Sequence, residues 1–287
     1  MHVLVMGGEG QLGRALRAVF GADSSIQVSS WDLPDYDMTQ PAISEQIARS
    51  EPDLVINAGA WTNVDGAEAK PESAYAANAL GPKFLADGCY KCGAPLVQIS
   101  TNEVFFGEEG AFFYEYDAPN PRSVYARSKA AGERAVQETH PAHFIVRIAW
   151  LYGVGGNHFP AKIISAADRH GALKVVDDEF GNPTYAVDVA FAIRDLVASE
   201  RYGIYHLVNE GYTNRLGLAK TVLMNAGREH VPVDPIKMAD WPRPAPSPPH
   251  SVLINQAAAA MGIRLPAWQE SISSYLALDA DRFAMQK

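Results

Sequence analysis

Short apolar runs alternate with longer helical segments over the first half of the chain. The pattern predicts strands at residues 3–6, 26–31, 53–57, 95–100 and 143–147. Helices are predicted between them, at residues 11–20, 70–92 and 126–138. Brief apolar runs bounded by turn residues are typical of buried strands, and longer alanine-rich stretches favour helix. Strands that alternate with helices are joined as parallel neighbours by crossovers. We therefore predict an α/β fold with a doubly wound parallel sheet of the Rossmann type.

The regular alternation ends near residue 150. Helices are predicted at 161–169 and 187–198, while residues 234–250 are dominated by proline. Proline excludes helix and central strand, so this segment is predicted to be an extended loop. The loop is either a surface connector or the rim of a ligand cleft. We predict a large domain over 1–150, with a returning segment at about 185–210, and a smaller discontinuous lobe over 151–287.

Composition and charge narrow the possible functions. The 287 residues are 47% hydrophobic and 20% charged, which is typical of a globular protein. A net charge of -9 argues against broad nucleic-acid binding, which requires a basic face. No apolar run approaches the ~20 residues of a membrane span, and no basic segment precedes the first strand as in a signal peptide. We expect no membrane association and a cytoplasmic location.

A glycine-rich turn follows the first predicted strand, with glycines at positions 7, 10 and 13. Gly7 permits a tight turn, Gly10 lets the backbone approach a pyrophosphate, and Gly13 lets the helix pack close to the strand. Helix N-terminal amides then face the phosphates. Gln11 and Leu12 lie within this turn, which predicts that the domain over 1–150 binds a dinucleotide.

Asp32 ends the second predicted strand, at the distance past the turn where a carboxylate accepts a hydrogen bond from the adenosine ribose. A 2′-phosphate would meet its negative charge, so this interpretation favours NADH over NADPH. The alternative is a solvated loop acid. Both cofactors therefore remain candidates.

Tyr125 and Lys129 are four residues apart in a predicted helix and share one face of it. Tyrosine, with an ordinary pKa of about 10, exchanges protons poorly at neutral pH. An adjacent ammonium favours the phenolate, so Lys129 is expected to lower the pKa of Tyr125 and to bond the nicotinamide ribose. Thr101 lies at the carboxyl end of a predicted strand, where open α/β sheets bind ligands. Together the three predict hydride transfer to or from a carbonyl, with Tyr125 as proton donor.

These motifs resemble the extended short-chain dehydrogenase/reductase family over nearly the whole chain. The resemblance is carried by segments 10–13, 57–65, 100–105, 125–133, 147–153, 180–184 and 203–207. It is closest to the branch that acts on sugars linked to dTDP. It implies reduction by NADH or NADPH of the C4 ketone of a dTDP-4-keto-6-deoxy-hexose, such as dTDP-4-dehydro-L-rhamnose to dTDP-L-rhamnose.

The resemblance also implies roles for further residues. Asp37 and Met38 would lie beside the adenine, and Trp150 would line the sugar pocket. The small residues that would pass beneath the cofactor are Ala58, Gly59 and Ala60. It further implies a homodimer and, in family members, Mg²⁺ at a subunit contact, although no residue of this chain is assigned to a metal.

Two departures from the family pattern affect the substrate side. Thr101-Asn102-Glu103 replaces the usual Thr-Asp-Tyr and is similar to the Thr-Asp-Glu of nucleotide-sugar 4,6-dehydratases. Because Asn102 cannot donate a carboxylic proton, dehydration lacks its acid, and we interpret Asn102 and Glu103 as substrate-binding. In the proline segment, Ser247 stands where the family has an arginine. Arg243 is the nearest arginine that would replace it as a partner of the diphosphate.

Other functions remain open beside the reductase. An epimerase would use the same cofactor and regenerate it, and a non-catalytic NAD(P)-binding regulatory subunit would share the fold. The second alternative predicts a damaged catalytic set, whereas Thr101, Tyr125 and Lys129 are all present. Cys89 and Cys92 form a Cys-x-x-Cys pair typical of redox or zinc sites, but no second pair or suitably spaced histidines accompany it.

Overall fold

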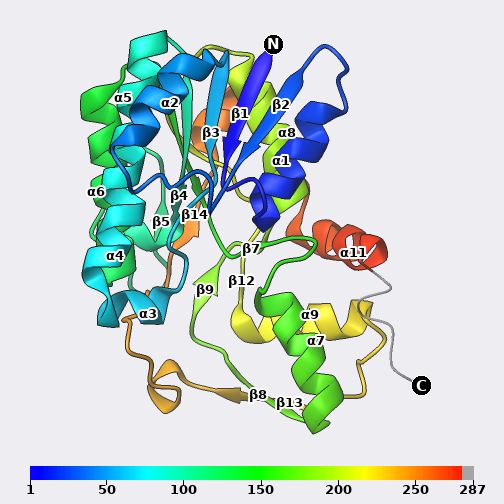
Figure 1. The fold of residues 1–287 in the computed structure, drawn as a ribbon. Helices are drawn as coiled ribbons and strands as arrows, with labels where there is room; N and C mark the ends of the chain where they lie inside the picture. The colour runs from blue at the N-terminus through cyan, green and yellow to red at the C-terminus, as the bar shows by residue number, and fades with distance from the viewer. Residues whose placement is uncertain (280–287) are drawn as a thin grey trace.

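The computed structural model describes residues 1–279, and residues 280–287 at the end of the predicted lobe lie outside the described residues. In the described part, six parallel strands form the main sheet (Figure 1). Their order across the sheet is β11-β6-β4-β3-β1-β2. The strands are β1 (His2–Met6), β2 (Gln27–Trp31), β3 (Leu54–Asn57), β4 (Leu96–Thr101), β6 (His143–Ile148) and β11 (Gly203–His206).

Helices cover both faces of this sheet. On one face, α1 (Gln11–Gly21) and α8 (Ala186–Val197) pack on side chains such as Val3 and Val5. The opposite face, which includes Leu4 and Met6, is covered by α2 (Ala42–Ser50), α5 (Gly81–Cys92) and α6 (Val124–Thr139). Central strands buried on both faces require continuous apolar runs, which explains the β1, β3 and β4 sequences. The doubly wound prediction is confirmed.

The order of the strands determines where a ligand can bind. β1 lies between β2 and β3, so the chain leaves β1 toward one side and later returns on the other. Loops that follow β1 and β3 therefore diverge at the carboxyl ends of these strands, and such a switch point is where open α/β sheets bind ligands. The predicted return at about 185–210 corresponds to α8 and β11 (Figure 1).

The helix predicted over 70–92 is divided by a wider turn. It comprises α4 (Pro71–Tyr75), a π-helical turn η1 (Ala76–Leu80) and α5, and it follows the short α3 (Val64–Ala69). A Cβ at Gly132 of α6 would lie 2.0 Å from the Asn78 carbonyl oxygen, so only glycine allows α6 to pack this closely on the π turn. The Asn78 amide in turn donates to Ser128 on α6. The helix that carries Tyr125 and Lys129 is thereby fixed against η1.

A second, smaller core lies below the sheet in Figure 1. Its helices are α7 (Phe159–His170), α9 (Arg215–Asn225) and α11 (Trp268–Leu278). The short α10 (Gln256–Ala260) packs instead against the sheet domain. Two-residue strands join the parts: β5 (Phe112–Phe113), β7 (Leu151–Tyr152), β9 (Phe180–Gly181), β10 (Thr184–Tyr185), β12 (Thr213–Asn214) and β14 (Val252–Leu253).

The prediction of an extended loop over 234–250 is wrong at its beginning. β13 (Val233–Ile236) pairs in parallel with β8 (Leu173–Val176), and a 3-10 turn, η3 (Met238–Asp240), follows. The pair is a two-stranded ladder, in which each strand has an open edge, so Pro235 is tolerated there as it would not be in a central strand. The rest of the proline segment runs beside α3 toward β14 (Figure 1).

Candidate active site

The glycine turn after β1 is shaped by close backbone contacts. Gly7 has φ +74°, and a Cβ there would lie 2.5 Å from the Gly59 nitrogen in the loop after β3. A Cβ at Gly13 would lie 2.2 Å from the Gly7 carbonyl oxygen. Gly10, the N-cap of α1, has no side chain to cap the first-turn amides. These amides at the switch point form a cradle that suits a dinucleotide pyrophosphate.

Asp32 is bonded to the glycine turn. Its carboxylate accepts from the Glu9 backbone N–H at 3.0 Å and from the Leu33 N–H at 2.9 Å. Arg17 forms an ion pair with Glu9 and also donates to the Gly8 carbonyl. Asp32 therefore is not merely a solvated loop acid: it lies at the end of β2, against the turn.

The remaining predicted cofactor residues surround the same turn. The Asp37 carboxylate accepts from the Thr39 N–H and hydroxyl, and these hydrogen bonds hold its pKa below the usual range. Met38 is buried beside Gly59, and a Cβ at Gly59 would lie 3.5 Å from the Met38 sulfur. In the 58–60 loop, Ala58 donates to the Met6 carbonyl, and Ala60 follows Gly59 with partial exposure.

Gln11 and Leu12 open α1 but point to different neighbours. Leu12 is buried in the core between the main sheet and α1. The Gln11 amide donates to the Leu151 carbonyl at 3.3 Å, which links the glycine turn to the segment after β6. Leu12 therefore serves packing, whereas Gln11 connects the cofactor side of the site to the smaller lobe.

Tyr125 and Thr101 meet at the carboxyl end of β4. Tyr125 lies in the first turn of α6, which Ser123 caps by accepting from the Ala126 N–H, while Glu68 accepts from the Val124 N–H at 2.7 Å. Burial raises the pKa of Tyr125 above its ordinary value, the Glu103 charge adds to this, and the adjacent Thr101 side chain partly opposes it.

Lys129 does not lower the pKa of Tyr125, contrary to expectation. Its buried ammonium donates instead to the Ile99 carbonyl at 2.6 Å. Burial lowers the pKa of Lys129 to about 8, and the Glu133 carboxylate partly opposes this change. At neutral pH the arrangement therefore pairs a protonated phenol with a positively charged lysine on the same face of α6.

The Asn102 side chain has a structural role in this site. It is buried, and its amide donates to the Ser251 hydroxyl at 2.5 Å and to the Ser251 carbonyl at 3.3 Å. This contact joins the end of β4 to the end of the proline segment. Since both amide hydrogens are used there, the geometry argues against the direct substrate contact predicted for Asn102.

Glu103 brings a carboxyl group near the proton donor. It lies in the 3-10 turn η2 (Asn102–Val104), where its backbone N–H donates to the Thr101 hydroxyl at 3.2 Å. Its Oε2 atom is buried and has no hydrogen-bond partner among the described residues. Burial and then the Glu179 charge raise the pKa of Glu103 to about 7, against the opposing charges of Arg243 and Arg215.

Trp150 stacks with Arg215, a residue that was not predicted from the sequence to belong to the site. It follows β6 with φ +41°, and a Cβ at Gly181 would lie 2.6 Å from its ring. The Arg215 guanidinium lies 3.6 Å from the centroid of the indole and donates to Glu179 at 2.6 Å. Arg215 is the first residue of α9, where the helix dipole disfavours a cation. That unfavourable position is the one signal in the sequence that marks it.

Arg243 connects the proline segment to the sheet domain. It donates to both Asp65 oxygens at 3.3 Å and to the Ser247 hydroxyl at 2.9 Å. Asp65 lies in α3, and both members of this pair act on the Glu103 charge. The loop therefore borders the site, which favours the rim over the surface connector.

Comparisons with known proteins agree on one family. A family model described as RmlD substrate binding domain matches residues 1–280. The dTDP-4-dehydrorhamnose reductase of Mycobacterium tuberculosis (strain CDC 1551 / Oshkosh) is 38% identical over 297 residues, covering 100% of this chain and 96% of that protein.

The chain belongs to the RmlD substrate binding domain family.

Solved structures of similar proteins extend this result to three dimensions. The dTDP-4-dehydrorhamnose reductase of Clostridium acetobutylicum has a TM-score of 0.93 and 36% identity, covering 97% of this chain and 99% of that one. That of Bacillus anthracis, solved in complex with NADP, has a TM-score of 0.93 and 32% identity, covering 96% and 99%. Asn102 and Glu103 are thus variations within the RmlD family and do not indicate a different fold.

Other candidate sites in this family member are weaker. Burial raises the pKa of the Cys89 thiol, which makes it less reactive, and the Cys92 thiol donates to carbonyls of its own helix. Within residues 1–279, no group of three or more His, Cys, Asp or Glu side chains is arranged to hold a metal. Among the same residues, every helix is too short or too polar to cross a bilayer.

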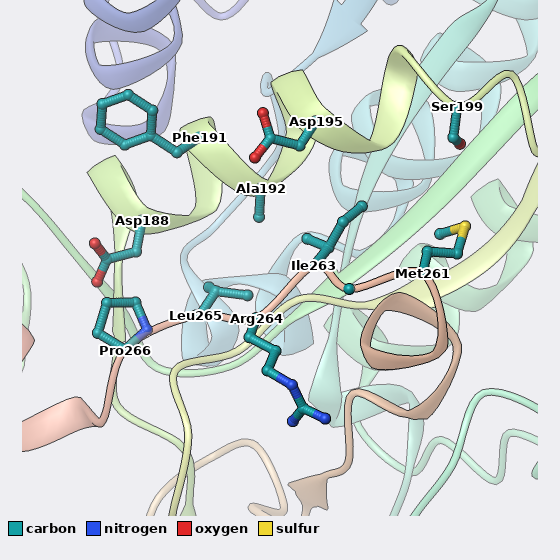
Figure 2. Close-up of a pocket in the computed structure, with 11 residues that line it drawn as sticks. Asp188, Phe191, Ala192, Asp195, Ser199, Met261, Ile263, Arg264, Leu265 and Pro266 are labelled. Atoms are coloured by element: carbon teal, nitrogen blue, oxygen red, sulfur yellow. The ribbon is translucent and has the colours of Figure 1, made fainter.

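A cavity of about 500 Å³ lies between α8 and residues 261–266 (Figure 2). Asp188, Phe191 and Asp195 of α8 border it on one side, and Arg264 on the other. No residue predicted for the site is among those that line it. The chemistry of the chain is therefore concentrated at the carboxyl ends of β1, β3 and β4.

Proposed function

We propose that this chain is an NAD(P)H-dependent reductase of the C4 ketone of dTDP-4-dehydro-L-rhamnose, which it converts to dTDP-L-rhamnose. The observation that carries the proposal is that Thr101 and Tyr125 meet at the carboxyl end of β4, at the same edge of the sheet as the glycine turn after β1. Family membership and the named activity of the relatives support the substrate. The proposed division is a dinucleotide-binding domain over 1–150, with α8 and β11 returning to it, and a substrate-binding lobe from 151 onward.

The cradle after β1 fits a dinucleotide. The turn formed by Gly7, Gly10 and Gly13 leaves room for the pyrophosphate, and Asp32 would bind the ribose. Met38 is buried against Gly59 of the 58–60 loop. When bound, NAD(P)H supplies the hydride for reduction. Asp32 favours NADH by its charge, whereas the relative from Bacillus anthracis was solved with NADP.

Proton transfer follows from the state of Tyr125. Burial keeps its phenol protonated, which suits a donor to the alkoxide that forms at C4 when the ketone accepts hydride. Thr101 holds the same oxygen by a second hydroxyl. Lys129 carries its positive charge on the same face of α6, bonded to the Ile99 carbonyl, and would bond the nicotinamide ribose of the cofactor. Tyr125 donates the proton, Thr101 orients the ketone and Lys129 holds the cofactor.

We place the sugar beside Trp150 and the diphosphate toward Arg215 and Arg243. Trp150 offers an apolar face, and Arg215 is held over it by Glu179. Guanidinium groups match the geometry of phosphate oxygens. The position of the proline segment beside Asp65 closes this side of the site.

The test is to follow oxidation of NADPH and NADH with freshly prepared dTDP-4-dehydro-L-rhamnose. Wild type is expected to oxidise at least one cofactor, and Tyr125→Phe is expected to lose roughly 100-fold or more in rate, as for removal of a general acid. Dinucleotide binding by both proteins is the control for folding. Binding without oxidation of either cofactor would reject the proposed substrate and favour a non-catalytic role. Cofactor that remains tightly held through purification and is regenerated would favour the epimerase.

A further inference from the structure

Glu103 lies beside the proposed proton donor yet has no part in the reduction. We propose that Glu103 acts as a base in a second reaction, removing a proton from a carbon next to the C4 ketone, so that the site exchanges this hydrogen with solvent. The inference rests on the proposed function, because the hydrogen is acidic only in a ketone bound at Thr101 and Tyr125.

Glu103 is positioned by the same turn that presents Thr101. Its backbone N–H donates to the Thr101 hydroxyl at 3.2 Å, and its carboxyl group acts on the charge of Tyr125. A ketone oxygen held by the Thr101 and Tyr125 hydroxyls therefore places C4 near Glu103. The carbons on either side of C4 are one bond away, and the proposal places one of them within reach of the Glu103 carboxyl group.

The Glu103 carboxyl group is equipped to accept a proton. One oxygen, Oε2, is buried and has no hydrogen-bond partner among residues 1–279. A structural carboxylate in such a position would normally be hydrogen-bonded, because an unpaired buried oxygen costs stability. The side chain as a whole keeps partial solvent exposure, which allows an acquired proton to exchange with water.

Charges around Glu103 support this role. Glu179 and Asp65 disfavour its ionised form, Arg215 and Arg243 favour it, and burial is the largest influence. The resulting pKa of about 7 lies near neutral pH, where a general base works best because both protonation states are populated.

The proposed step is balanced without an oxidant or a reductant. The Glu103 carboxylate takes the proton as the C–H bond breaks, and the electron pair forms a double bond to C4. The C4=O π electrons move to the oxygen, which the Tyr125 and Thr101 hydroxyls stabilise by hydrogen bonds. Return of a solvent-derived proton from Glu103 restores the ketone, now with its hydrogen exchanged.

The experiment incubates the enzyme with dTDP-4-dehydro-L-rhamnose and NADP⁺ in D₂O, where no hydride is available. Mass spectrometry measures deuterium uptake, NMR identifies the carbon, and an enzyme-free sample measures the background. Wild type is expected to exchange a hydrogen next to C4 well above background. Glu103→Gln is expected to lower the exchange rate roughly 100-fold, the scale of a general base, and more than it lowers reduction with NADPH.

Glu108→Gln is the matched control, because Glu108 is an exposed acid in the following segment, and it should exchange like wild type. If the glutamine variant fails to bind NADPH, Glu103→Asp replaces it and should exchange more slowly than wild type. Reduction by wild type without exchange would overturn this inference and leave the reductase intact. Exchange by Glu103→Gln at the wild-type rate would also overturn it. A protein that binds NADPH but neither reduces nor exchanges this ketone would refute the proposed function as well.

Discussion

The guanidinium of Arg215, the first residue of α9, lies 3.6 Å from the ring centroid of Trp150, which follows β6. Arg215 donates two hydrogen bonds to the Glu179 carboxylate, at 3.0 and 2.6 Å, and these hold the guanidinium in place. A cation held over an indole contributes about 0.5–2 kcal/mol. This stack forms one wall of the proposed sugar and diphosphate site.

Arg215→Met should therefore raise the KM for the nucleotide sugar by roughly tenfold, equivalent to a loss of about 1.4 kcal/mol, with a smaller change in kcat. The loss follows because methionine keeps apolar contact with Trp150 but cannot bind phosphate oxygens. Steady-state kinetics with NADPH saturating measures both constants. Arg194→Met is the control, since Arg194 also stands over an aromatic ring, Phe191, and pairs with Asp195 on the surface. An equal KM for wild type and Arg215→Met would place the diphosphate elsewhere.

Glu103 should make the stability of the protein depend on pH. In the unfolded chain it ionises near its ordinary pKa of 4.5, and in the folded state near 7. Between these values the folded state holds more protons, so stability contributed by this group falls as pH rises through the window. The difference is up to about 3 kcal/mol above pH 7.

Glu103→Gln should consequently be more stable than wild type above pH 7 and similar to it below about pH 4.5, where both side chains are neutral. Thermal unfolding of the two proteins across this range measures the difference. Glu108→Gln should show no such trend, because Glu108 is exposed. A difference in stability that stays constant with pH would show that Glu103 has the same pKa in the folded and unfolded states.

Lys129 should determine the basic limb of the pH profile of kcat/KM. Burial disfavours its charged form and lowers its pKa to about 8, so the ammonium is lost as pH rises through this value. The charged donor proposed to bond the nicotinamide ribose is lost with it, and kcat/KM for the ketosugar should fall above pH 8. Lys129→Arg should move the limb to higher pH, because a guanidinium keeps its charge. Lys83→Arg, at an exposed position, should leave the profile unchanged. A profile that is identical in Lys129→Arg would assign the limb to another group.

Asp32 should influence the choice between the two cofactors. Its carboxylate lies at the end of β2 and accepts from the Glu9 N–H, beside the place predicted for the adenosine ribose. Asp32→Asn removes the negative charge and should raise the ratio of kcat/KM for NADPH to that for NADH. Asp35→Asn, a nearby exposed acid, should leave the ratio as in wild type. An unchanged ratio in Asp32→Asn would show that Asp32 acts only on the glycine turn.

The fold was predictable because its signals are local. Buried strands such as β1 and β3 are short, mostly apolar runs, and Gly7, Gly10 and Gly13 mark a turn between a strand and a helix whose spacing indicates dinucleotide binding. Two-residue strands such as β7 and β9 contain too few positions to show a period. The short β13 was missed because Pro235 argues against a strand, and only its place in a two-stranded ladder makes it acceptable.

The chemistry of the site was predictable in residue type but not in pairing. Tyr125 and Lys129 share a helix face, as their spacing indicates, but the partner of Lys129 is the Ile99 carbonyl, 30 positions away. Asn102 meets Ser251 across 149 positions, so its burial had no local signal. The pKa of Tyr125 is raised mainly by burial and then by the Glu103 charge, neither of which the spacing of Tyr125 and Lys129 reveals, and this explains why the expected direction was wrong.

Gly13 offers a sharp test of the cofactor cradle, because a single methyl group decides the outcome. A Cβ there would lie 2.2 Å from the Gly7 carbonyl oxygen and 2.6 Å from the Gly8 Cα, and both are backbone atoms that cannot turn aside. Gly13→Ala must therefore displace α1 from the turn, and we expect the affinity for NADPH to fall at least tenfold, about 1.4 kcal/mol. Gly21→Ala, in the last turn of the same helix, meets nothing within 4 Å and should bind like wild type. Titration of NADPH by protein fluorescence compares the variants. If Gly13→Ala folds and binds NADPH as tightly as Gly21→Ala, the dinucleotide does not use this turn.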